Sequence, residues 1–292
     1  MGAWAVARKR IAALGIEFEE HVTSRAGEAT DATREALLAG TTHIVAVGGD
    51  GTLNEVVNGY LNDTGSAINN AASIALLPSG TGSDFRRSLG LTSQSSSLRT
   101  LIESETRLVD AGRAEFKDLN GADGSRFFIN IASFGLGGDV SEMVNRWSGR
   151  LPRWIGGRAR FGTAAIAALG RYKNVAVSLR LDEREMRISS NLIVVANGRF
   201  AGGGMMLAPH AEVDDGMFDV IVTDGATRFD VIKELPRIQR GSHLKNPKVK
   251  EMRSGQVSID SEEPMAIDLD GEMVGWTPAV LKVLPSTIRF RG

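Results

Sequence analysis

The chain has 292 residues, 42% of them hydrophobic and 24% charged, a composition typical of soluble globular proteins, and its length favours two domains. Its 34 basic and 35 acidic residues leave a net charge of −1, so a preference for any polyanion must come from a local patch. The absence of cysteine excludes disulfides, thiolate metal sites and cysteine nucleophiles. Apolar stretches fall far short of the roughly 18 residues of a membrane span, and we expect a cytoplasmic protein.

The first part of the chain alternates helices with strands. The patterns predict helices over residues 3–14 and 31–39, the second starting as early as Glu28, and strands over 16–22, 44–47 and 73–77. Such alternation predicts a doubly wound parallel sheet, with ligands bound beyond the carboxyl ends of its strands. Because the chain opens on a helix, we expect the first strand of this layout to be missing and the chain to be truncated or its start misplaced.

A glycine turn joins the strand at 44–47 to a helix. The turn reads Gly48-Gly49-Asp50-Gly51-Thr52, and apolar residues at helical spacing follow it. Glycines let the backbone approach phosphate oxygens, and the amides at a helix N-terminus attract anions. Asp50 is placed to hold magnesium on ATP. The alternative is a tight turn capped by Asp50 or Thr52; we favour a nucleotide-phosphate site.

A second glycine turn follows the next strand, at residues 78–85. It reads PSGTGSDF and offers the hydroxyls of Thr81 and Ser83. Since parallel strands end at the same edge of a sheet, both turns can face one crevice. The alternative is a loop in which Asp84 caps a helix. Its position after a parallel strand favours a functional turn.

Beyond Ala111 strands outnumber helices. We predict helices over 140–147, 159–171 and 229–240, and strands over 126–133, 175–181, 191–196, 217–223, 265–270 and 279–284. This pattern predicts a mostly antiparallel β-sandwich domain. We therefore divide the chain into an α/β domain at 1–111, a β domain at 112–284 and a tail at 285–292 that returns to the first domain.

Three acidic or glycine-rich segments lie in the second part. In AIDLDGEMV, at 266–274, Glu272 follows Asp270-Gly271 and can accept the proton of a hydroxyl that attacks a phosphoryl group, but the residues alone favour a hairpin turn. Asp214-Asp215-Gly216 can bind a hard cation or cap a turn, and the two alternatives stay open. The loop at 197–209 is equally an apolar substrate cleft or a flexible connection.

The segment 146–161 carries five arginines and two tryptophans. Arginine with tryptophan is what an anionic membrane interface attracts. The alternatives are a phosphate contact and a solvated basic helix. We expect an anion or interface contact and a transient stay at the inner face of the membrane. Nucleic acid is not an expected partner, because the rest of the chain offers no matching basic surface.

Five motifs in this order resemble one family. They are GGDGTLNEVVNG at 48–59, PSGTGSDF at 78–85, three glycines at 202–204, DDG at 214–216 and DGE at 270–272. The chain resembles the diacylglycerol kinase catalytic domain family, in particular the soluble bacterial lipid kinases. The resemblance covers nearly the whole chain and implies ATP- and magnesium-dependent phosphate transfer to a membrane lipid, with diacylglycerol converted to phosphatidic acid.

The resemblance also implies roles for particular residues. Glu272 would be the general base, and Asp50 would share in catalysis. Asp215 would hold a structural magnesium ion together with the backbone carbonyls of Glu212 and Met217. The residues that would contact ATP lie in three segments: Thr23; Gly49, Asp50, Gly51, Thr52, Leu53, Asn54 and Glu55; and Thr81.

Two departures from the family pattern stand out. Relatives begin with a strand ending in an Asn-Pro-x-x-Gly turn, which residues 1–10 lack, and Ser83 replaces the usual Asn. Two other functions stay open: an NAD kinase-like enzyme, which shares the GGDGT turn, and a non-catalytic nucleotide- or lipid-binding protein. The acceptor lipid and the oligomeric state are also open, a homodimer being one option.

Overall fold

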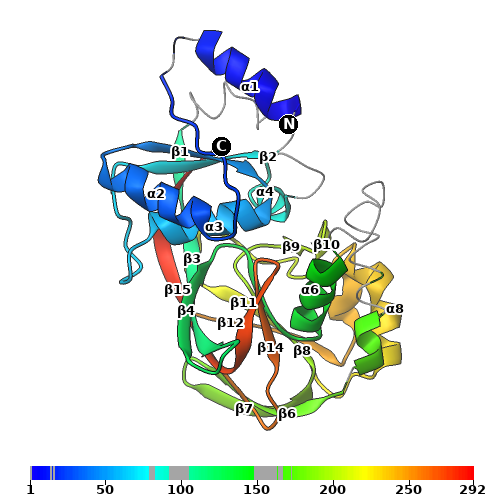
Figure 1. The fold of residues 1–292 in the computed structure, drawn as a ribbon. Coiled ribbons are helices and arrows are strands. Elements are labelled where there is room, and N and C mark those ends of the chain that lie inside the picture. Colours follow the sequence, from blue (N-terminus) through cyan, green and yellow to red (C-terminus); the bar gives the residue numbers. More distant parts are fainter. Residues whose placement is uncertain are drawn as a thin grey trace.

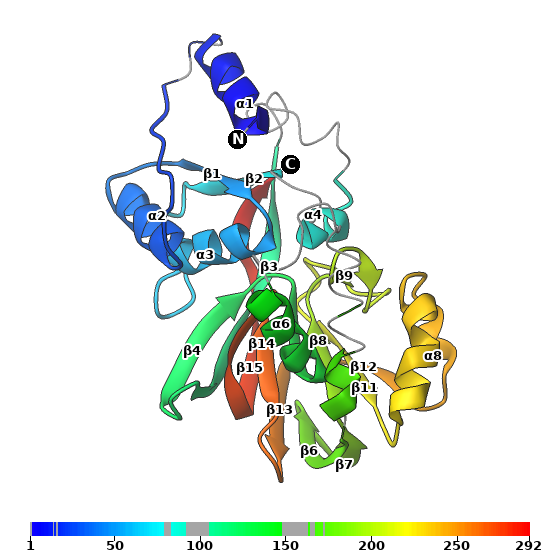
Figure 2. The same cartoon turned by 45° about the vertical axis from the view of Figure 1, so that its right-hand side comes forward.

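The computed structural model describes residues 2–13, 15, 17–78, 83–91, 105–147, 163, 167–171 and 173–292. Figures 1 and 2 show an α/β part next to a larger strand-rich part, with the long strand β15 (Glu272–Arg291) running from one into the other. This architecture confirms the predicted fold class. The boundaries drawn at residues 111 and 284 stay a prediction.

The α/β part is built around two parallel strands. Its elements are α1 (Gly2–Ala13), α2 (Glu28–Leu38), β1 (His43–Gly48), α3 (Asp50–Tyr60), β2 (Ser73–Pro78) and α4 (Asp84–Ser88). In Figure 1, α2 and α3 lie on one side of β1 and β2, and α1 lies on the other. β2 also pairs in parallel with the end of β15, where Phe290 lies opposite Ile74. On its other side, β1 pairs with no strand of the described residues.

The strand predicted at 16–22 is wrong. Residues 17–24 form no regular structure and are exposed, including Phe18 and Val22. Three glutamates occupy positions 17, 19 and 20, so the segment has no continuous apolar face to bury against the sheet. Alternation alone does not form a strand that has neither a partner strand nor a buried face.

The second part is antiparallel throughout. Its strands are β3 (Thr106–Asp118), β4 (Asp123–Phe128), β5 (Ile131–Gly135), β6 (Val175–Leu181), β7 (Arg184–Ser190), β8 (Leu192–Ala196), β9 (Phe200–Ala201), β10 (Met205–Met206), β11 (Phe218–Thr223), β12 (Val249–Ser254), β13 (Gln256–Ser261) and β14 (Ala266–Leu269). Its helices are α6 (Leu136–Trp147) and α8 (Arg228–Ile238), with short 3-10 turns η1 (Leu169–Arg171) and η2 (Ser242–Lys245). The main path runs β12-β11-β8-β5-β14-β15-β13-β6-β7.

Several predicted elements have other limits than the sequence suggested. The strand expected at 126–133 is two strands, β4 and β5, because the chain breaks at Ile129 and Asn130. The strand expected at 279–284 is the middle of the 20-residue β15. The helix expected at 159–171 lies largely outside the described residues. No helix among the described residues is long and apolar enough to span a bilayer.

Two cores stabilise the two parts. One lies in the β domain and contains Phe128, Phe134 and Phe218, all fully buried. The other lies under α2 and α3 and is completed by residues from far along the chain, such as Phe290. Because late strands complete the early core, the two parts are joined by shared packing, and the crevice between them has fixed walls on both sides.

Candidate active site

The GGDGT turn forms the first wall of the crevice. β1 ends at Gly48, Gly49 is extended, and α3 begins at Asp50. A Cβ on Gly48 would lie 2.3 Å from the Thr52 hydroxyl oxygen, so only glycine fits there. The strand, turn and helix are those predicted, and the first amides of α3 are oriented as an anion site requires.

Asp50 joins the two glycine turns. Its carboxylate accepts hydrogen bonds from the backbone N–H of Asp84, at 2.9 Å, and of Phe85, at 3.1 Å, at the start of α4. Burial raises the pKa of Asp50 from its ordinary value, and these two hydrogen bonds oppose that rise. The side chain thus fixes the start of α4 against the GGDGT turn. Its predicted roles at ATP and magnesium stay predictions.

The rest of the predicted ATP segment lies on α3, and its side chains point to different parts of the protein. Leu53 is fully buried in the core, so only its backbone faces the turn. Glu55 accepts hydrogen bonds from the N–H groups of Gly27 and Ala29, both at 3.0 Å, and thereby stabilises the start of α2. Asn54 is fully buried and donates to the carbonyl oxygen of Phe127 at 3.1 Å.

Glu272 lies beside the GGDGT turn, although 221 positions separate it from Gly51. It begins β15, directly after the hairpin turn that leaves β14. Oε2 of Glu272 lies 2.7 Å from Nη2 of Arg126, and Oε1 would lie 3.6 Å from a Cβ on Gly51. The hairpin and the functional interpretation of this segment therefore agree, because the hairpin is what brings the carboxylate to the turn.

Asp270, in that hairpin, holds the site together. Its carboxylate accepts from Asn54 Nδ2 at 2.8 Å and from the N–H groups of Ile129, Asn130 and Ile131 at 2.9, 3.0 and 2.9 Å. Burial raises the pKa of Asp270, and these hydrogen bonds oppose the rise. This contact also explains the break between β4 and β5, since three successive amides turn toward one carboxylate.

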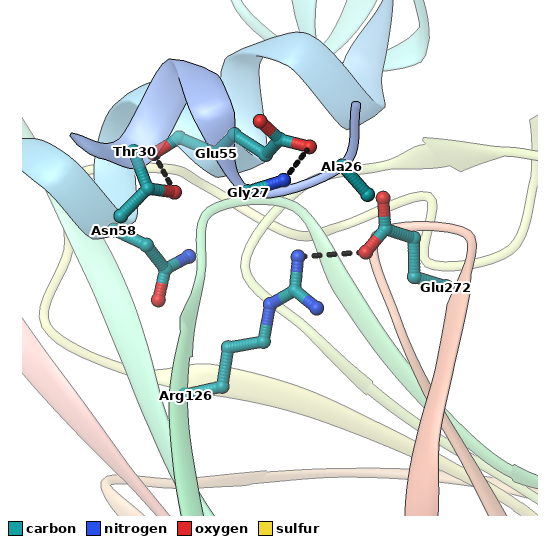
Figure 3. Close-up of a pocket in the computed structure, with 7 residues that line it drawn as sticks. All are labelled: Ala26, Gly27, Thr30, Glu55, Asn58, Arg126 and Glu272. Atoms are coloured by element: carbon teal, nitrogen blue, oxygen red, sulfur yellow. Dashed lines mark hydrogen bonds and ion pairs between the residues drawn. The ribbon is translucent and has the colours of Figure 1, made fainter. Parts of the chain in front are cut away.

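A pocket of about 270 Å³ lies between the two parts. Figure 3 shows its lining: Ala26, Gly27, Thr30, Glu55, Asn58, Arg126 and Glu272. These residues come from α2 and the segment before it, from α3, from β4 and from β15. Arg126 and Glu272 approach each other across the pocket, which gives it one cationic and two anionic groups. The lining is therefore polar and charged.

Two predicted ATP contacts, Thr23 and Thr81, stay predictions. Thr23 is exposed in the irregular segment before α2 and does not line the pocket, which begins three residues later at Ala26. Thr81 lies outside the described residues, together with the rest of 79–82. Sequence reasoning missed the roles of Arg126 and Asp270, because the strand pattern around each gives no sign of a partner more than 100 positions away.

The DDG turn is ordered by other contacts than a metal ion. Asp215 Oδ1 accepts from the N–H of Met217 at 3.0 Å, and Oδ2 pairs with Arg253. Buried Asp110 accepts from the N–H groups of Gly216 and Ser286, both at 2.7 Å. A cation at Asp215 would have to replace the guanidinium. The predicted magnesium site at Asp215, with the backbone carbonyls of Glu212 and Met217, stays a prediction. The described residues contain no group of three His, Asp or Glu side chains that could hold a metal ion.

Comparison with known families identifies the chain. The diacylglycerol kinase catalytic domain matches residues 2–114, and the YegS C-terminal NAD kinase beta sandwich-like domain matches residues 130–291. The chain belongs to the diacylglycerol kinase-like family of lipid kinases. As a family member it is a kinase, and the GGDGT turn and the DGE hairpin lie in its two matched domains.

Individual relatives span most of the chain. It is 30% identical to a diacylglycerol kinase of Bacillus subtilis over 266 residues, which cover 90% of this chain and 82% of the relative. It is 31% identical to a YegS-like lipid kinase of Pseudomonas aeruginosa over 288 residues, or 98% of this chain and 87% of the relative. A diacylglycerol kinase structure from Bacillus anthracis has the same fold, with a TM-score of 0.69 at 19% identity, covering 98% and 90% of the two chains.

Proposed function

We propose that this lipid kinase transfers the γ-phosphate of ATP to the hydroxyl of a membrane lipid, with diacylglycerol as the acceptor and phosphatidic acid as the product. The names of its relatives support diacylglycerol as the first candidate. ATP would enter as its magnesium complex, the form in which the metal neutralises the phosphates.

The observation that carries the proposal is the approach of Glu272 to the GGDGT turn. A phosphate held by the amides at the start of α3 would lie next to both Gly51 and the carboxylate of Glu272. A hydroxyl placed there is within reach of both a base and an electrophile, which is the arrangement that phosphoryl transfer requires. The carboxylates of Asp50 and Glu55, by contrast, accept hydrogen bonds from backbone amides.

In the proposed reaction, Glu272 accepts the proton of the lipid hydroxyl while the oxygen of that hydroxyl attacks the γ-phosphorus. The bond from that phosphorus to the oxygen bridging to the β-phosphate breaks, and ADP leaves. Arg126 orients Glu272 by pairing with its second oxygen. Asn54 and Asp270 fix the walls of the crevice against each other.

The experiment that tests the proposal is transfer of labelled γ-phosphate from ATP into a panel of acceptors. The panel should contain diacylglycerol, phosphatidylglycerol, a sphingoid base and NAD, with labelled products separated by extraction. Product in the diacylglycerol lane is the expected result. Product only in the NAD lane would show the NAD kinase-like alternative to be correct, and ATP binding without any product would show a non-catalytic relative.

We also propose that the enzyme is cytoplasmic and contacts the inner face of the membrane transiently, since its acceptor is dissolved in the bilayer. The basic segment 146–161, predicted to make this contact, lies largely outside the described residues. A homodimer stays one option for the assembly. Sedimentation of the protein with and without vesicles would check the membrane contact and the oligomeric state.

A further inference from the structure

The outer face of α8 is apolar and exposed. Phe229 is 68% exposed and Ile232 is 44% exposed, one helical turn apart, and Pro236 follows on the same face. The opposite face packs inward, with Val231 and Ile238 buried. The inner face of α8 is therefore buried against the protein, and its outer face leaves an aromatic and an aliphatic side chain directed to solvent.

Cations lie on and just after this helix. Arg228 and Lys233 are exposed on α8, Arg240 is exposed two residues after its end, and none of the three forms an ion pair with a described residue. Both acidic residues of the helix are paired with bases, Asp230 with Lys248 at 2.8 Å and Glu234 with Arg237 at 2.9 Å. The cations along this helix therefore exceed its anions, although the whole chain has a net charge of −1.

The helix is linked to the hairpin that carries Glu272. Val231 packs into a small core with Leu136 and Val140 of α6, and α6 packs on β14 and β15. Figures 1 and 2 both show α8 at the outer edge of the β domain, on the side of α6 and away from β4 and α1. A surface that held α8 would thus lie one helix away from the strands of the catalytic carboxylate.

We propose that the outer face of α8 docks the enzyme on an anionic bilayer. Phe229 and Ile232 insert among the acyl chains near the headgroups, and the surrounding cations contact lipid phosphates. A second copy of the chain is a poorer occupant, because a two-fold contact would set one cationic face against an identical one. The reason for docking rests on the proposed function, a lipid substrate in the bilayer. Binding of α8 to the bilayer follows from its exposed side chains alone.

The test uses vesicles and two double variants of the full chain. Binding to vesicles of equal phosphatidylglycerol and phosphatidylcholine is measured by sedimentation for wild type, Phe229→Ser/Ile232→Ser and Lys233→Gln/Arg240→Gln. The second variant should bind about 30-fold more weakly, because each cation near such a surface contributes about 1 kcal/mol. The first should lose binding to a similar degree. Leu119→Ser is the control, since Leu119 is 60% exposed beside Asp118 on the turn after β3.

Activity on a soluble short-chain diacylglycerol separates this inference from the proposed function. Variants that bind vesicles weakly but keep wild-type turnover of the soluble acceptor support docking through α8. Unchanged vesicle binding by both variants would overturn it, and so would a variant that only changes the oligomeric state. Wild-type protein that binds vesicles through α8 but phosphorylates no lipid would refute the proposed function and leave the docking surface standing.

Discussion

Arg126 and Glu272 form an ion pair at the centre of the site, with Nη2 and Oε2 2.7 Å apart. The same guanidinium donates to Asn54 Oδ1 from Nη2 at 2.7 Å and from Nε at 3.1 Å. Arg126 thereby fixes one oxygen of Glu272 and leaves the other on the side of Gly51. Asn54 is in turn fixed by Asp270, so the position of the proposed base depends on a chain of contacts across both parts.

Replacing Arg126 with lysine should impair turnover more than ATP binding. A single ammonium group cannot reproduce a fork that contacts Asn54 and Glu272 together, so the base loses its orientation. We expect kcat to fall about 100-fold with little change in KM for ATP. Arg113→Lys, on the neighbouring strand β3, is the matched control. A kcat equal to that of wild type would show that Arg126 does not orient the base.

Alanine at Gly48 should lower stability, whereas alanine at Gly51 should lower activity. At Gly48 a Cβ would lie 2.3 Å from the Thr52 hydroxyl oxygen, and we expect a loss of about 1–3 kcal/mol in the free energy of unfolding. At Gly51 a Cβ meets only Glu272, at 3.6 Å, so stability should be kept. The added methyl group takes up space beside the turn where the proposed phosphate binds, so kcat/KM should fall about ten-fold or more. Urea unfolding and phosphotransfer assays distinguish the two; full activity of Gly51→Ala would place the phosphate elsewhere.

Asp270→Asn should unfold more easily. Each carboxylate oxygen accepts two N–H groups, so an amide in either orientation sets its NH₂ against two donors. We expect a loss of about 2–4 kcal/mol in the free energy of unfolding. The backbone of Asp270 has φ 52°, which asparagine adopts as readily. Asp182→Asn, at φ 48° in an exposed turn, is the control. Equal losses in the free energy of unfolding for the two variants would contradict a special contribution from the buried hydrogen bonds of Asp270.

His243 should make stability depend on pH. It is buried, with Nε2 3.1 Å from the carbonyl oxygen of Leu207, and burial lowers its pKa. Because the folded pKa lies below the unfolded value of about 6.5, the unfolded chain takes up the proton first as pH falls. The stability that neutral His243 contributes is present above that value and is lost below it.

The measurement compares wild type with His243→Gln by urea unfolding from about pH 7 down to pH 5. As the pH falls, the free energy of unfolding of wild type should decrease relative to that of His243→Gln. A constant difference across this range would contradict the assignment.

Local pattern was enough to predict the GGDGT turn, because strand, glycines and helix follow one another within one stretch of the chain. The hairpin at Asp270-Gly271 was also predictable from its turn residues. The resemblance, not spacing, placed Glu272 beside the turn. Asp270 and Arg126 could not be assigned roles, since their value comes from partners such as Asn54, 216 positions before Asp270.

Burial explains the other differences. β3 was missed because Asp110, Gly112 and Arg113 interrupt its alternation, yet Asp110 is buried where it accepts two backbone amides. The segment 16–22 alternates, but its described residues are exposed and pair with no described strand. In both segments the tertiary neighbours decided the structure, and a single sequence does not show them.

The most direct test of the account is Glu272→Gln assayed for ATP binding and for labelled phosphate transfer to diacylglycerol. Glutamine has the same shape but cannot accept the hydroxyl proton. ATP should bind with wild-type affinity while transfer falls by about 10²–10⁴-fold, and Glu115→Gln on β3 should retain wild-type transfer. Normal turnover by Glu272→Gln would contradict the assignment of Glu272 as the base.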